Sequence, residues 1–463
     1  MNETMFLCYA FLWSFTILVP LMAVLNWRRV GGAEQLLIPA LLYYYSLYGA
    51  WTVLSVKRGN LTSDALDHLE ASLVTVNIDG NYLLTICLYG LFVSLVVLGI
   101  GIRRNDLHGS PASGMPAIDG APSVGRLISL ALVALVLSAV TLWAEILSAI
   151  DQGVPIYILT RTEASRWFTV HQLLNRAGLA AISAAWPVLL LHGQRERHVR
   201  ASGVVLGGLT LAWLGFLGAL GDRNAVVVAA VGGFYFYRML GGRIQWTRVL
   251  LLAGVAFMVL RTIEYLRANP AADMLGTLAE AVTTARFWNP LALARGSESL
   301  AAHLSLYGII EKHLPLTWGE SLVYLAQSLV PFIPSGDRVQ DSYQTYAHLV
   351  GAPASQGFNI HFAAGAYLNA GIPGLMVAAG IVVVLFHAAR LTAARMAMRT
   401  RLQYPGLFAY AIFCSLLPIG MRAGPEGIKA LVFEGFLLPM VVIAMCVRRA
   451  RPVESPSLIH RVH

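Results

Sequence analysis

The sequence predicts an all-α protein that crosses a membrane many times. Hydrophobic residues make up 57% of the 463 residues and charged residues only 12%, whereas soluble globular proteins carry about 25% charged residues. The mean hydropathy is +0.65. Several apolar runs reach or approach the ~20 residues that a helix needs to cross a bilayer. A transmembrane β-barrel would show alternating segments of about ten residues instead, so we expect one polytopic helical domain over 1–463.

Apolar runs bounded by polar or basic residues predict about 11–12 membrane-spanning helices. In chain order the runs are 4–26, 35–56, 81–102, 127–150, 177–192, 201–220, 225–237, 249–266, 361–388, 405–420 and 428–447. The first run has neither a basic leading region nor a small-residue cleavage site. We therefore expect it to be a retained helix rather than a signal peptide.

Two segments between the apolar runs have a composition of their own. Residues 105–125 are rich in Gly, Pro and Ser, which predicts a flexible cytoplasmic linker. Residues 267–360 form the longest non-membrane segment, and the spacing in 273–288 and 296–313 predicts amphipathic helices there. Residues 318–333 are apolar but too short for a full span, which predicts a re-entrant or interfacial helix that ends at prolines.

The basic residues orient the chain. Every second loop is strongly basic, and the positive-inside rule assigns those loops to the cytoplasm, with the N-terminus outside and the C-terminus inside. Many arginines nevertheless fall in the outer loops, which predicts an anion-binding outer face. The alternative is that they pair with local acids such as Glu163, Asp222, Glu264 and Glu298.

The other composition signals are weak. The net charge of +9 comes from short loops between spans and does not indicate nucleic-acid binding. The four cysteines lie inside apolar runs, which is typical of small core residues, and their spacing predicts neither a metal site nor a disulfide framework.

The stretch Gly221-Asp222-Arg223-Asn224 separates two apolar runs and so marks a membrane surface. An arginine at mid-membrane costs about 2.5–3.5 kcal/mol on insertion scales and less near the edge. Arg223 is therefore expected either to bind a ligand or to pair with an acid such as Asp222.

Three stretches resemble the Wzy-type polymerases of bacterial surface polysaccharide, the O-antigen and enterobacterial common antigen polymerases. They are Gly221 to Ala225; Phe332-Ile333-Pro334 with Arg338 and the Gly-rich stretch from Phe358 to Gly374; and Met421-Arg422-Ala423-Gly424. The layout, about a dozen spans with one large outer loop in the C-terminal half, is similar too. The related O-antigen ligases show a His followed two positions on by a polar residue. Here His361 is followed by Phe362 and Ala363, which favours a polymerase over a ligase.

The resemblance implies a membrane glycosyltransferase with a GT-C-like architecture in the bacterial inner membrane, its active site facing the periplasm. It would transfer a growing glycan from undecaprenyl diphosphate to an incoming lipid-linked repeat unit, without a cofactor or metal. The implied partners are undecaprenyl-diphosphate-linked oligosaccharide, membrane lipids, a chain-length regulator and a flippase, and no nucleic acid. The alternatives are a ligase that transfers glycan to lipid A core, a transporter or flippase of lipid-linked glycan, and a non-catalytic assembly protein.

This chemistry requires cations for the diphosphate, a general base for the acceptor hydroxyl and surfaces for sugars. The expected diphosphate-binding residues are Arg223, Arg338, Arg422 and Arg166. The expected catalytic residues are His361, Glu426 and Glu163. The expected sugar-binding residues are Tyr343, Tyr346 and Asn359.

Several of these assignments have a structural alternative. His361 would be a hydrogen-bonded residue at a helix start, and Arg422 would form an ion pair with Glu426, four residues on. Asp337 and Asp341 would neutralise Arg338. The tyrosines would anchor the chain at the membrane interface.

Overall fold

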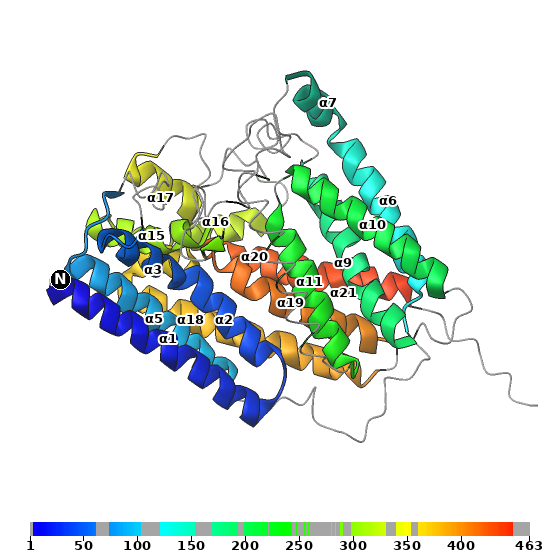
Figure 1. Cartoon of the computed structure of the whole chain (residues 1–463), viewed down its shortest axis with the longest axis horizontal. Coiled ribbons are helices and arrows are strands. Elements are labelled where there is room, and N and C mark those ends of the chain that lie inside the picture. The colour runs from blue at the N-terminus through cyan, green and yellow to red at the C-terminus, as the bar shows by residue number, and fades with distance from the viewer. Residues whose placement is uncertain are drawn as a thin grey trace, which may run out of the picture.

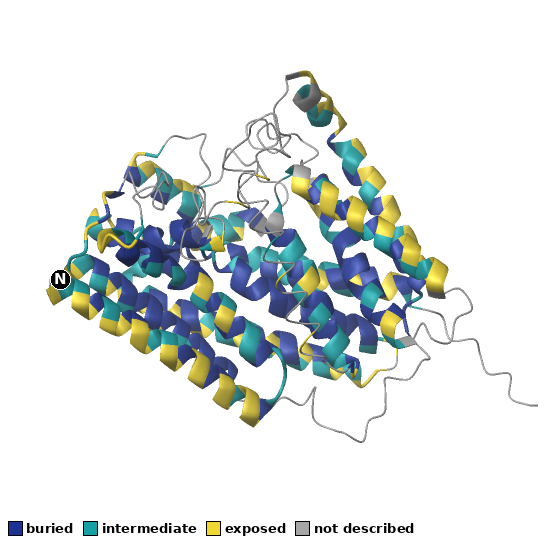
Figure 2. Cartoon of the chain, viewed as in Figure 1, coloured by how far each residue is buried: buried dark blue, intermediate teal, exposed yellow. Residues whose placement is uncertain are grey.

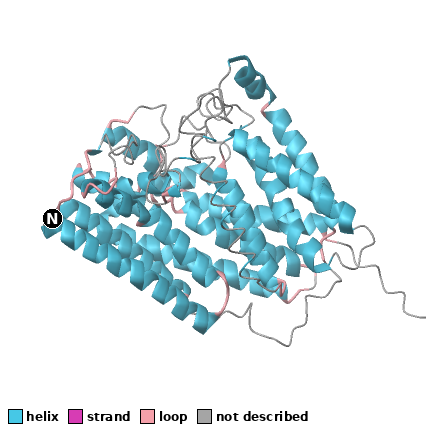
Figure 3. Cartoon of the chain, in the orientation of Figure 1, coloured by secondary structure: helices cyan, strands magenta, loops and turns pink. Residues whose placement is uncertain are grey.

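The described chain consists of α-helices packed side by side (Figure 1). A computed structural model describes residues 3–61, 74–102, 121–152, 168–192, 199–220, 222–242, 298–329, 339–352, 360–399 and 401–447, with a few isolated positions between 247 and 289. Within these ranges no strand is present beyond one isolated bridge between Pro122 and Val447 (Figure 3). Helices satisfy every backbone group within one segment, which hydrocarbon demands.

The helices divide at the gap that follows α11. The first group is α1 (Glu3–Val30), α2 (Glu34–Ser46), α3 (Tyr48–Lys57), α5 (Gly80–Ile100), α6 (Val124–Thr141), α7 (Trp143–Gln152), α9 (Phe168–His192), α10 (Val199–Leu220) and α11 (Arg223–Met239). The second group is α15 (Glu298–Glu311), α16 (Glu320–Leu329), α17 (Ser342–Val350), α18 (Phe362–Ala397), α19 (Gln403–Gly420), α20 (Gly427–Val432), the π-helical turn η4 (Phe433–Leu437) and α21 (Leu438–Cys446).

Eight helices of the described chain are long and apolar enough to cross a membrane, which confirms a multi-pass helical membrane protein. They are α1, the pair α2–α3, α5, α6, α9, α10, α18 and the run from α20 to α21. The predicted runs 225–237 and 405–420 form α11 and α19, which fall short of that combined length and hydropathy. The predicted run 249–266 lies almost entirely outside the described residues.

Neighbouring helices form a continuous series through the molecule: α1 packs on α5, α5 on α18, α18 on α19, α19 on α11, α11 on α9 and α9 on α6. The core lies in the middle of this series (Figure 2), where α19 is buried from Tyr404 to Ile419. Exposed residues on α1, α6 and α10 include many large apolar side chains, as expected for helices that face lipid.

The segment 267–360 contains three described helices. Residues Ser299 to Ile310 of α15 are buried on every side, so this helix has no solvent-facing stripe, in contrast to the amphipathic helix predicted over 296–313. Of the predicted linker 105–125, the part up to residue 120 lies outside the described residues. Its last residues lead into α6, and the backbone N–H of Ser123 donates to the carbonyl of Cys446.

Helix α18 is interrupted after two turns. Ala370 and Gly371 have non-helical backbone angles, and Gly371 has φ of 64°, a left-handed conformation that favours glycine. Pro373, which lacks an amide proton, follows two residues after Gly371. The first segment of α18 and the long remainder are therefore two helical pieces joined at a kink.

Candidate functional site

The loop between α19 and α20 carries Arg422 and Glu426, two of the predicted site residues. It lies at the upper end of the bundle, which we define as the end where α11, α18 and α20 begin (Figure 1). The N–H of Phe362 donates to the carbonyl of Met421, and the N–H of Gly424 donates to the carbonyl of Ile360, 2.9 Å away. These two bonds attach the loop to the start of α18.

Gly424 is required by the shape of this loop. Its φ is 69°, and a Cβ at this position would lie 2.5 Å from Oε2 of Glu426. Any larger residue would therefore meet both backbone strain and a collision with the carboxylate. The positive φ and the close approach explain why this loop contains glycine.

Glu426 is bound to the N-terminus of α17. Its Oε1 accepts hydrogen bonds from the backbone N–H and the hydroxyl of Ser342, both 2.8 Å away. Burial raises the pKa of Glu426, the two Ser342 bonds partly offset that rise, and nearby Asp341 adds to it. Burial also raises the pKa of Asp341. The pair of acids is thus arranged so that Glu426 accepts a proton more readily than an exposed glutamate does.

Arg422 is half-buried and is itself engaged in other interactions. No ion pair joins it to Glu426 within the described chain, and the carboxylate of Glu426 accepts from Ser342 instead. The predicted alternative of an Arg422–Glu426 pair is therefore not the arrangement seen here. A second cation, Lys429, donates to the carbonyl of Ser328 at 2.9 Å and so attaches α20 to the end of α16.

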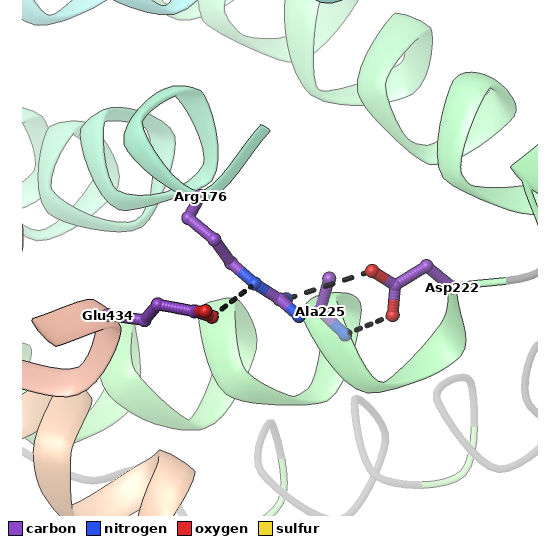
Figure 4. A network of polar contacts seen from close by, with 4 residues as sticks. All are labelled: Arg176, Asp222, Ala225 and Glu434. Atoms are coloured by element: carbon purple, nitrogen blue, oxygen red, sulfur yellow. Dashed lines mark hydrogen bonds and ion pairs between the residues drawn. The ribbon is translucent and has the colours of Figure 1, made fainter. Parts of the chain in front are cut away.

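A second polar group lies where α9, α11 and η4 meet, and is centred on Arg176 (Figure 4). Nε of Arg176 donates to Oε2 of Glu434 at 3.2 Å, and Nη1 lies 3.8 Å from Oδ2 of Asp222. Oδ1 of Asp222 accepts from the N–H of Ala225 at 3.2 Å and so caps α11. Both carboxylate oxygens of Asp222 therefore have a partner. The cation of Arg176 and the N–H of Ala225 together stabilise the negative charge of Asp222.

The side chain of Arg223 is not among the described side chains, although its backbone opens α11. Asp222, the acid that the alternative pairs with Arg223, binds Arg176 and caps α11. The diphosphate-binding role of Arg223 stays a prediction.

A cavity of about 20 Å³ adjoins Arg176 and Glu434. Its other walls are apolar and come from α9, α11, α19 and α21: Leu179, Ala180, Ala225, Val228, Ala229, Ile412, Leu416 and Pro439. This volume suits about one water molecule, and the two ionic groups supply the polar partners that such a water needs.

The two polar groups are connected by one helix. Glu426 precedes α20 and Glu434 lies in η4, so the two carboxylates are separated by roughly 12 Å along the helix at 1.5 Å per residue. π-Helical turns are rare and often occur at functional sites. Here the turn carries the acid that reaches Arg176.

His361 is a buried helix cap in this structure. Its Nδ1 accepts from the N–H of Ala363 at 3.0 Å, so Nε2 carries the proton and donates to the hydroxyl of Ser46, also at 3.0 Å. The residue is fully buried, and burial with a nearby histidine lowers the pKa of His361 to about 3. Neither ring nitrogen faces an open space for substrate, which favours the structural alternative.

His303 on α15, which sequence analysis did not single out, completes this network. Its Nδ1 donates to the carbonyl of Ser46 at 2.8 Å, so its Nε2 accepts from the hydroxyl of Tyr82 at 3.1 Å. Burial lowers the pKa of His303 to about 4. Together the two histidines join α2, α5, α15 and α18 at the upper end.

The remaining predicted residues are divided between α17 and the undescribed parts of the chain. Tyr343 is half-buried on α17, at the upper end. Tyr346 is fully buried against α15, with its hydroxyl 2.5 Å from where a Cβ of Gly308 would lie, so its ring is not exposed for stacking on a sugar. Glu163, Arg166, Arg338 and Asn359 lie outside the described residues.

Sequence analysis did not pair Arg176 with Glu434. The available signal was that Glu434 lies within an apolar run and Arg176 borders one, because ionisable residues in such places normally find an opposite charge. Ser342 and His303 gave no such signal, since a single serine or histidine in a sequence does not indicate its partner.

Comparisons with protein families, with curated proteins and with solved structures find no match to this chain. The helices and the two polar groups at their upper end therefore define its class by themselves: a polytopic helical membrane protein with ionisable residues gathered at one end of the bundle.

Proposed function

We propose that this chain is a membrane glycosyltransferase that polymerises undecaprenyl-diphosphate-linked oligosaccharide repeat units at the periplasmic face of the bacterial inner membrane. The proposal includes a GT-C-like architecture. The observation that carries it is the α19–α20 loop, in which the cation Arg422 and the carboxylate of Glu426 lie four residues apart against the starts of α17 and α18.

In the proposed reaction Glu426 removes the proton from the acceptor hydroxyl. The resulting oxygen attacks the anomeric carbon of the donor glycan, and the bond from that carbon to the diphosphate oxygen breaks. Undecaprenyl diphosphate leaves with the electron pair. The raised pKa of Glu426 suits a group that must accept a proton near neutral pH. His361 is not used, because its ring nitrogens cap α18 and bind Ser46.

Arginines stabilise the leaving diphosphate, since a guanidinium keeps its charge and binds phosphate oxygens in pairs. Arg422 lies nearest to Glu426 in sequence, and Arg223 opens α11 at the same end of the bundle. Arg166 and Arg338 remain part of the proposed set from the sequence alone. Tyr343, at the start of α17, is the described candidate for a sugar contact.

The test is chain extension by the purified protein in proteoliposomes supplied with a lipid-linked repeat unit. A ladder of products that disappears in Glu426→Gln, while Lys312→Gln at an exposed position just after α15 keeps it, supports the proposal. Transfer only to added lipid A core would identify a ligase. Movement of lipid-linked glycan across the bilayer without a new glycosidic bond would identify a transporter.

A further inference from the structure

Helix α16 has its polar and apolar sides reversed relative to a helix that faces water. Ser321 and Ser328 are buried against the bundle at 3% and 8% exposure, whereas Leu322 and Val323 are 56% and 49% exposed. Ala326, one turn after Leu322, is exposed as well. A surface helix of a soluble domain turns its apolar side to the core, so the outer side of α16 is built for an apolar environment.

The inner side of α16 is fixed by hydrogen bonds, so the outer side is fixed as well. The side chain of Asn369, on α18, accepts from the N–H of Ser321 at 3.4 Å and from the hydroxyl of Thr317 at 3.3 Å. The N–H of Thr317 donates to the carbonyl of Leu368 at 2.9 Å. Lys429 binds the carbonyl of Ser328 at the other end.

The turn before α16 exposes a tryptophan. Trp318 is 80% exposed and has φ of 48°, a conformation that is uncommon for a residue with a side chain. Tryptophan is the side chain most typical of the membrane interface, where its ring meets lipid and its N–H meets water. Glu320, the one charged residue of α16, sits at its first turn, where the helix dipole favours an acid.

The apolar side of α16 continues into the surfaces of two spans. Just beyond the kink of α18, Ile372 and Met376 are 48% and 43% exposed. On η4, after the lysine that binds α16, Phe433 and Leu437 are 47% and 38% exposed. These two pairs of residues belong to α18 and to the run from α20 to α21, which are apolar enough to cross a membrane. Helix α16 therefore lies between two surfaces that face lipid.

We propose that α16 is an in-plane membrane helix whose outer side, formed by Trp318, Leu322, Val323 and Ala326, contacts the acyl chains of one lipid leaflet at the upper end of the bundle. Its 10 residues span about 15 Å, half of the hydrocarbon core. It therefore rests at the boundary between headgroups and acyl chains, as amphipathic interfacial helices do. The partner is the lipid surface itself.

Spin labels on single cysteines test this in phosphatidylcholine proteoliposomes. Cys87, which is partly exposed, is replaced by Ser so that it does not take up the label. The other cysteines, Cys8, Cys414 and Cys446, are buried and are kept. Labels at Leu322→Cys and Ala326→Cys are compared with Leu132→Cys on the exposed side of α6 and His348→Cys on the exposed side of α17. Relaxation is measured with oxygen, which concentrates in lipid, and with a water-soluble nickel chelate.

The expected result is that Leu322 and Ala326 labels respond to oxygen and not to nickel, as the Leu132 label does. Nickel accessibility like that of His348 would overturn the proposal, because the helix would face water. Shielding from both agents would overturn it too, because protein would cover the helix.

A second measurement uses the chain with all native cysteines. In vesicles of phosphatidylcholine with brominated acyl chains, we expect the fraction of tryptophan fluorescence that is quenched to fall in Trp318→Phe. An unchanged or increased quenched fraction would contradict insertion of Trp318 among the acyl chains.

Discussion

Arg176 on α9 and Glu434 in η4 are joined by a hydrogen-bonded ion pair of 3.2 Å between Nε and Oε2. The side chains are 26% and 29% exposed, so the pair lies between the surface and the core. Because Asp222 shares the same guanidinium, one cation holds three helical segments together.

Removal of Arg176 should destabilise the protein. Arg176→Leu leaves the carboxylates of Glu434 and Asp222 without their cation. We expect the free energy of unfolding to fall by about 1–3 kcal/mol, between the values for exposed and buried ion pairs. The measurement is thermal unfolding in detergent, with exposed Arg395→Leu as the matched control, which should stay within about 0.5 kcal/mol of the parent.

A double substitution isolates the pair itself. Arg176→Leu combined with Glu434→Leu should lose less than the sum of the single variants, because no carboxylate of Glu434 is left stranded. Strict additivity would show that the two side chains do not depend on each other.

Arg223→Lys should reduce polymer formation severely at normal membrane expression. Lysine keeps the charge but lacks the planar fork that binds two phosphate oxygens. One lost charge-assisted bond of about 1.5–3 kcal/mol corresponds to roughly a ten- to hundred-fold weaker stabilisation. The measurement is the single-turnover rate together with product length.

Asp222→Asn provides the comparison for Arg223. Since Asp222 binds Arg176 and caps α11, this variant should lose stability in the way that Arg176→Leu does. If Arg223→Lys works nearly normally, Arg223 has no diphosphate-binding role, whatever Asp222→Asn does.

The pH dependence of polymerisation should report Glu426. Burial raises the pKa of Glu426 above the ordinary value for glutamate, and only the ionised form accepts a proton. The rate should therefore rise with pH through that raised pKa. Ser342→Ala removes a hydroxyl that stabilises the carboxylate, so the rising limb should move to higher pH.

If the rate of Ser342→Ala rises at the same pH as that of the parent, the group whose ionisation controls the rate is not Glu426. Glu426→Gln should remove the limb together with most of the activity. If the residual activity of Glu426→Gln still rises with pH in the same way, the rise comes from the ionisation of another group.

Acid should destabilise the upper end of the bundle through its two buried histidines. The folded pKa values of His303 and His361 are about 4 and about 3, whereas unfolded histidine titrates near about 6.5. Protons therefore bind the unfolded chain first, and the stabilisation present above about pH 6.5 is lost as pH falls, by up to about 1.4 kcal/mol per unit for each histidine. Thermal unfolding in detergent between pH 7.5 and 5 measures this.

The control for acid sensitivity is His361→Asn. Asparagine caps helices well but does not titrate, so this variant should be less stable at neutral pH and less sensitive to acid. Equal acid sensitivity in the parent and the variant would contradict the assignment.

The orientation of the bundle is open to a reporter experiment. A reporter that is active only in the periplasm should be active when fused after Ala268 and silent after Arg401, because the alternation of basic loops places the upper end outside. The opposite pattern would place that end in the cytoplasm and remove the proposed site.

Sequence reasoning reached the fold class and most spans because hydropathy and length depend only on local composition. The run 127–150 illustrates the limit: α6 ends at Thr141 and α7 begins at Trp143, a break that no proline or glycine announces. Ser299 to Ile310 is another case, since a helix of mixed composition is buried only when its neighbours surround it.

The candidate site was harder to predict for the same reason. Glu426 and Arg422 were found because both lie in one short loop. The partners of Glu426 and Arg176, namely Ser342 and Glu434, are far away in sequence, and only tertiary packing brings them together. His361 shows how two readings of one residue stay open in the sequence: a histidine suited to catalysis is equally suited to cap a helix, and only the hydrogen bond from Ala363 shows the cap.

The kink in α18 has a consequence for how the chain is assembled during synthesis. Ala370 and Gly371, which have non-helical backbone angles, interrupt the helix just after Leu368, and lipid offers no hydrogen-bond donor to a carbonyl at such an interruption. The N–H of Thr317 donates to the carbonyl of Leu368, and Thr317 leaves the ribosome before Leu368 does. The segment with Thr317 is thus synthesised before α18. Its N–H is available when the kink of α18 forms, so the carbonyl of Leu368 need not be exposed to lipid.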